Sequence, residues 1–134
     1  MINKKNGAVE IAGQIIYPDC TSAQFGGMPV AKEGTRKTPS KDWEVFEGIV
    51  DAKLLAALRF RAGLLEEVTL RLRDNKPSSW DNWSEESELE LKRKHDAWLR
   101  ECLGEEPYQF SWGMVFSVYD KKTGASSIII KYTH

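Results

Sequence analysis

The sequence is poor in the residues on which many small catalytic and metal-binding sites depend. It has two cysteines and two histidines in 134 residues. Cys20 and Cys102 lack the CxxC spacing of zinc or redox sites, and two thiols do not make a disulfide scaffold. The chain also has no GxSxG, GxGxxG or GxxxxGK[ST] motif. We therefore expect no cofactor and no metal, and the sequence predicts no catalytic residue.

Long apolar segments and a strong excess of one charge are also missing. No run of about 18 apolar residues is present, so no membrane-spanning helix is expected. The basic start, MINKKN, is not followed by the apolar stretch of a signal peptide, which predicts a cytoplasmic protein. The formal net charge of −1 argues against nucleic acid as the partner, because phosphate binding needs a basic field.

What remains is the composition of an ordinary folded domain. Apolar residues make up 41% of the chain and charged residues 29%, so the chain has enough apolar surface to form a core. Its length suits a single domain spanning residues 1–134. The segment at about 18–41 is loop-like because glycine and proline interrupt any periodicity. It is predicted to be a surface loop; the alternatives are a short strand near residues 28–31 or a mobile binding loop.

Several shorter segments have the composition of strands. Residues 8–17 are predicted to form one strand with a bulge at Gly13, and residues 43–50 and 68–73 to form two more. Residues 51–62 are ambiguous, because DAKLLAALR is rich in helix formers whereas the next residues alternate. We predict a short helical turn followed by a strand there.

The clearest local signal lies in residues 109–132, where two strand-like runs flank the turn sequence DKKTG. The second run places Ile128 and Ile130 on one face and Ile129 on the other. The first run alternates, and its larger side chains are predicted to face the core: Phe110, Trp112, Met114, Phe116 and Val118. The segment is therefore predicted to be a C-terminal β-hairpin around which the domain is organised.

One helix is predicted, over residues 84–103. Ser84 or Ser87 is a suitable N-cap, and Gly104 is a suitable stop. One face carries Leu91, His95, Trp98 and Cys102, flanked by Leu99 and Leu103, so this helix should lie on a sheet. The predicted fold is α+β: one twisted antiparallel sheet of about five or six strands, covered on one face by this helix. In general type, but not in any motif, such a small acidic-leaning chain is similar to immunity or antitoxin proteins.

Two candidate sites follow from the sequence. The first is an acidic patch with two tryptophans, suited to a basic protein partner, and it consists of Trp80, Asp81, Trp83, Glu85, Glu86 and Glu88. This patch predicts a non-enzymatic protein-binding module, which we describe as immunity-like. The second is a pocket between helix and sheet near His95, which would suit a small ligand or a minor enzymatic activity. A third hypothesis is a homodimer formed through a free sheet edge.

A carboxylate cluster is also conceivable. Four acids lie close together in the sequence, Asp42, Glu44, Glu47 and Asp51. They would suit general acid–base chemistry or a hard metal ion if their carboxylates converged. Because such a pattern is common on the solvated side of a strand, we predict that they are surface residues.

Overall fold

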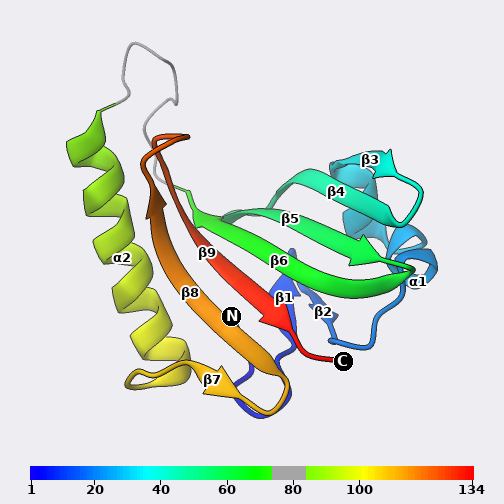
Figure 1. Ribbon diagram of the computed structural model, residues 1–134, viewed down its shortest axis with the longest axis horizontal. Coiled ribbons are helices and arrows are strands. Elements are labelled where there is room, and N and C mark those ends of the chain that lie inside the picture. Colours follow the sequence, from blue (N-terminus) through cyan, green and yellow to red (C-terminus); the bar gives the residue numbers. More distant parts are fainter. Residues whose placement is uncertain (74–83) are drawn as a thin grey trace.

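The computed structural model describes residues 1–73 and 84–134, which form an α+β domain. Within these residues, seven strands form one antiparallel sheet in the order β3-β4-β5-β6-β9-β8-β7. They are β3 (Thr35–Ser40), β4 (Trp43–Val50), β5 (Leu54–Arg61), β6 (Leu64–Leu72), β7 (Gln109–Phe110), β8 (Gly113–Asp120) and β9 (Ala125–Tyr132). Figure 1 shows the sheet strongly curved, with β3 and β4 at one end and β8 at the other. The predicted fold class is confirmed, with seven strands in place of five or six.

One face of this sheet carries the core. Along β5 the buried side chains alternate with exposed ones, so Leu54, Ala56, Leu58 and Phe60 point inward while Leu55 points outward. The inward face packs against an N-terminal β-hairpin, two short helices and one long helix. Each large apolar side chain buried in this way stabilises the fold by about 1.5–3 kcal/mol before entropy is counted.

The N-terminal hairpin replaces the single strand that the sequence predicts for residues 8–17. Its strands are β1 (Val9–Ile11) and β2 (Gln14–Ile16), which pair antiparallel as a separate two-stranded sheet. Ala12 and Gly13 between them have φ of 52° and 77°. Positive φ at both central residues is the geometry of a two-residue hairpin turn, so Gly13 reverses the chain instead of forming a bulge.

Residues 18–41 differ from the predicted loop because most of them belong to regular elements. They contain the helix α1 (Ser22–Gly26), the 3-10 helix η1 (Pro29–Glu33) and strand β3. Thr21 caps α1 through a capping box with Gln24, and the Phe25 ring packs against the rings of Phe46 and Phe60. The glycines and prolines therefore separate short elements that pack on the sheet.

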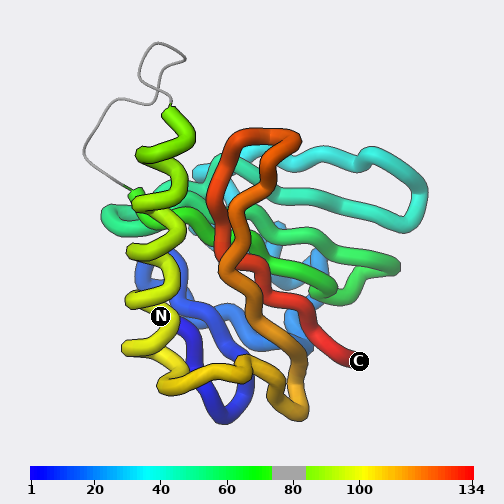
Figure 2. Tube along the Cα trace, turned by 60° about the vertical axis from the view of Figure 1, so that its left-hand side comes forward, coloured from blue at the N-terminus to red at the C-terminus, as the bar shows by residue number. Residues whose placement is uncertain are grey.

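The long helix α2 (Glu85–Leu103) has nearly the predicted bounds. The Ser84 hydroxyl accepts a hydrogen bond from the Ser87 N–H at 3.0 Å, and Gly104 ends the helix with φ of 82°. The buried stripe consists of Leu91, His95, Leu99 and Leu103, whereas Trp98 and Cys102 of the predicted face are only partly buried. The helix packs on β6, β8 and β9, and Figure 2 shows it beside the β8–β9 hairpin.

The C-terminal hairpin is confirmed, but the predicted core face of its first strand is wrong. Met114 and Phe116 are 37% and 39% exposed, whereas Val115 is buried on the inner face with Ile128 and Ile130. Trp112 is buried as predicted, yet it lies in the turn between β7 and β8. Because the turn shifts the alternation, Trp112 does not share a strand face with Met114, Phe116 and Val118.

Residues 51–62 also differ from the predicted helical turn followed by a strand. A tight turn at Asp51 leads directly into β5, with the Asp51 carboxylate accepting the N–H groups of Lys53 and Leu54 at 2.8 and 2.7 Å. In this helix-forming run, all four residues Leu54–Ala57 pair with β6, and Leu55 and Ala56 also pair with β4. Tertiary pairing therefore overrides their helical propensity.

Candidate functional site

The two edges of the seven-stranded sheet have very different residues. Strand β3 is exposed along its whole length and carries Arg36, Lys37 and Pro39. Charged side chains and a proline discourage the addition of another strand. At the other end, residues 115–119 of β8 read VFSVY, with neither a charge nor a proline. The β8 edge therefore lacks the features that protect the β3 edge.

Strand β7 covers only the beginning of β8. It pairs with Gly113 and Met114, and the Val115 N–H donates to the Tyr108 carbonyl at 3.0 Å. Outward-facing backbone groups recur at every second residue of an antiparallel strand, so Ser117 and Tyr119 point the same way as Val115. In the part of the chain that the structure describes, no strand pairs with them on this side. We call this segment, Val115–Tyr119, the β8 edge.

A groove of about 310 Å³ lies between the β8 edge and α2. Lys92 and Asp96 of α2 line one side, residues 106–109 line another, and residues 114–118 form the strand side. The Ser117 hydroxyl oxygen is buried and has no hydrogen-bond partner among residues 1–73 and 84–134. A buried hydroxyl of this kind favours a partner that brings a polar group.

The predicted acidic patch lies only partly in the described residues. Trp80, Asp81 and Trp83 fall outside them. Glu85 and Glu86 are exposed on the first turn of α2, where the helix dipole favours negative charge. The pKa of Tyr119 on the β8 edge is raised by desolvation and then by the nearby charges of Glu85, Glu88 and Asp120. The acidic start of α2 therefore adjoins the β8 edge.

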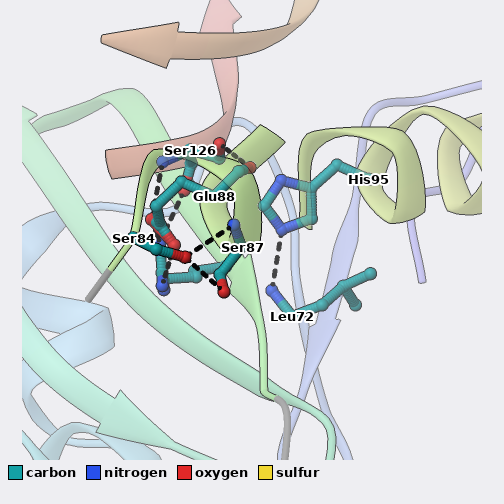
Figure 3. Close-up of polar contacts among 7 residues, drawn as sticks. Leu72, Ser84, Ser87, Glu88, His95 and Ser126 are labelled. Carbon is teal, nitrogen blue, oxygen red and sulfur yellow. Dashed lines mark hydrogen bonds and ion pairs between the residues drawn. The ribbon is translucent and has the colours of Figure 1, made fainter. Parts of the chain in front are cut away.

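Glu88 does not belong to an exposed patch, because its side chain points inward and the residue is only 6% exposed. Its two carboxylate oxygens accept hydrogen bonds from the Arg71 guanidinium at 2.5 and 2.8 Å. The Ser126 N–H donates to the same carboxylate, and the Ser126 hydroxyl donates to the Glu88 carbonyl (Figure 3). The Arg71 hydrogen bond lowers the pKa of Glu88. This residue holds α2 against β6 and β9.

His95 lies between helix and sheet, as predicted, but it is fully buried and does not line the groove. Its Nε2 accepts the Leu72 N–H at 3.1 Å, which ties α2 to the end of β6 (Figure 3). An accepting Nε2 requires neutral imidazole with its proton on Nδ1. Burial lowers the pKa of His95 to about 4, and the positive charge of Arg71 acts in the same direction. Its described contacts are those of a structural residue.

This contact predicts a loss of stability in mild acid. The pKa of His95 is 6.5 in its ordinary state and about 4 in the fold, so the unfolded chain binds the proton first. The contribution of neutral His95 to the free energy of unfolding is present above pH 6.5 and is lost as the pH falls toward 4. Between about pH 7 and pH 5 we expect a loss of roughly 2 kcal/mol from this group. Urea unfolding at both pH values measures it.

The matched variant for this measurement is His95→Gln. Its amide oxygen can accept the Leu72 N–H in place of Nε2, but it does not titrate. The difference in unfolding free energy between the two pH values should therefore shrink by about 2 kcal/mol in the variant. Equal differences in the two proteins would show that His95 is not responsible.

The four acids of residues 42–51 do not converge on one site. Glu44 binds the Ser22 hydroxyl at 3.0 Å and Arg36 at 2.6 Å, while Glu47 forms an ion pair with Lys37. Asp51 accepts backbone N–H groups, including that of Ala12 at 2.9 Å. Across residues 1–73 and 84–134, no group of three or more His, Cys, Asp or Glu side chains is arranged to hold a metal ion.

Comparisons with known proteins add no family to this description. No protein-family model, curated protein or solved structure matches the chain. Among the described residues, no helix is long and apolar enough to cross a membrane. The geometry of the β8 edge is therefore the basis for a functional proposal. The sequence carried one signal of this edge, the uncharged run VFSVY, but the strand order that exposes it is not a local property.

Proposed function

We propose that this protein is a non-enzymatic protein-binding module that pairs the β8 edge with an extended segment of its partner. The observation that supports the proposal is the pair of outward-facing backbone units at Ser117 and Tyr119, next to a groove. In strand addition, main-chain hydrogen bonds supply affinity and side-chain pockets supply specificity. Such a module acts by binding alone, as an immunity-like protein would.

The charges around the edge favour a basic partner. Asp96 and Glu106 line the groove, and Glu85 and Asp120 lie close enough to Tyr119 to affect its titration. Lys92 offsets Asp96, with Nζ at 3.1 Å from the carboxylate. A lysine or arginine in the incoming segment would meet the remaining negative charge, which favours association and sets the orientation of the segment.

The substitution Tyr119→Pro tests the proposal. Proline removes the outward N–H and places its ring on the open edge, so capture of the partner should fall about tenfold or more. Pro39 in β3 shows that this sheet accepts a proline at an edge. The measurement is affinity capture from native lysate, with the captured proteins quantified by mass spectrometry.

Tyr119→Ala is the matched control, because it removes the same side chain and keeps the N–H. It should retain the partner, and circular dichroism should show both variants folded. Partner capture that is equal in the two variants would contradict binding at the β8 edge. A wild-type protein that captures neither another protein nor a second copy of itself would contradict the function itself.

A further inference from the structure

We infer that a second copy of this chain fits the β8 edge, so that two β8 strands pair antiparallel about a two-fold axis through Val118. This inference rests on the proposed function, and it names the partner segment. It is carried by three observations: the direction of the free backbone groups, the apolar side chains beside them, and the charges at the two ends of the edge.

The free backbone groups are self-complementary. With the axis at Val118, Ser117 of one copy lies opposite Tyr119 of the second copy, and the reverse holds by symmetry. Both residues point away from β9, so each of these opposed pairs can exchange two hydrogen bonds. The contact of Val115 with Tyr108 is left intact, because pairing needs no residue before Ser117. A two-fold interface of this kind is closed and adds no further copies.

The side chains that meet are compatible with this register. Val118 faces Val118 of the second copy as a non-hydrogen-bonded pair, in which side chains approach most closely. Phe116, 39% exposed, lies on the same outer face as Val118 and extends the apolar strip across the junction. Ser117 lies on the groove side, where its buried hydroxyl would face Tyr119 of the second copy.

Charge complementarity supports the same occupant. Beyond Asp120 the chain continues with Lys121 and Lys122, which are exposed in the β8–β9 turn. In this register Asp120 of the second copy lies opposite Phe116. Tyr108 and β7 occupy the places beside Val115 and Met114, so the turn with the two lysines ends next to residues 106–109 of the groove. Asp96 and Glu106 line it as well. The chain therefore supplies the basic segment that its own groove favours.

Cross-linking tests the register. In a background with Cys102→Ser, Val118→Cys places two thiols across the axis at a Cα separation of about 4.5 Å, which a disulfide spans. Mild oxidation should give a covalent dimer. Phe116→Cys is the matched control, because its two thiols would lie about 13 Å apart and should not join. Sedimentation equilibrium of the unmodified chain should show mass doubling with concentration, and Tyr119→Pro should stay monomeric.

Failure of this inference and failure of the proposed function give different results. Equal cross-linking of both cysteine variants, or a chain that stays monomeric at about 1 mM, would overturn the dimer. If a monomeric chain still captures a partner that Tyr119→Pro loses, the β8 edge binds another protein and the proposed function stands. If that capture survives Tyr119→Pro, both proposals are overturned.

Discussion

Replacing Glu88 with alanine should lower the free energy of unfolding by about 2–3 kcal/mol, even though Glu88 lies on the first turns of a surface helix. The substitution removes the carboxylate that holds the Arg71 guanidinium through two hydrogen bonds. It also leaves the Ser126 N–H, buried beneath α2, without its acceptor. A buried donor that loses its partner costs about 1–3 kcal/mol by itself.

Urea unfolding at neutral pH, followed by circular dichroism, measures this loss. The matched control is Glu90→Ala, an exposed acid on the same helix, which should change stability by no more than about 0.5 kcal/mol. Glu88→Gln keeps an acceptor for the Ser126 N–H but loses the charge. Its loss of unfolding free energy should therefore lie between those of Glu88→Ala and Glu90→Ala. A loss of under about 1 kcal/mol for Glu88→Ala would contradict the anchoring role of this residue.

The position of Glu88 shows what helical periodicity predicts and what it does not. The sequence predicts α2 nearly to the residue because its signals are local: a serine cap, a glycine stop and a stripe that begins with Leu91 and His95. Glu88 lies on that stripe, three residues before Leu91, so its burial has a signal in the sequence. Its ion-pair partner is a strand residue from another part of the chain, and no local pattern specifies that contact.

The two hairpins that sequence patterns miss share one cause. Both have Ala-Gly as the two-residue turn, at Ala12-Gly13 and at Ala62-Gly63, with positive φ at every one of these residues. Asn-Gly and Asp-Gly are the strong signals for such turns, because asparagine and aspartate tolerate positive φ better than alanine does. Because the second turn has no strong signal in the sequence, residues 51–62 are interpreted from their helix-like composition. Strand β5 is therefore only partly predicted.

The candidate site was the least predictable feature for a related reason. The acidic patch is a prediction from neighbours in the sequence, whereas the β8 edge exists only because β7 is two residues long and the strand order ends there. The alternation within β8 predicts two faces correctly. Which face is buried depends on the preceding turn, and that turn places Trp112 out of phase with the strand.

Gly113→Ala should be the most damaging single change in that turn, with a loss of about 4 kcal/mol or more. A Cβ added at Gly113 would lie 2.1 Å from the Lys131 carbonyl oxygen and 3.0 Å from the Tyr132 Cα. Both are backbone atoms of β9, paired with β8, so neither can rotate away as a flexible side chain would. The φ of 155° at Gly113 adds backbone strain for any residue with a side chain.

Gly13→Ala is the control, because Gly13 has φ of 77° and no atom within 4 Å of an added Cβ. This variant has the backbone strain but no contact between the added Cβ and other atoms, so its free energy of unfolding should fall by about 1–2 kcal/mol. Thermal unfolding compares the two variants. The NMR signal of the Trp112 indole N–H reports local damage, because this N–H donates to the Lys4 carbonyl at 2.9 Å and the ring stacks on Phe110. If both variants lost the same amount of unfolding free energy, the contact of an added Cβ with β9 would cost little. That result would contradict the prediction for Gly113.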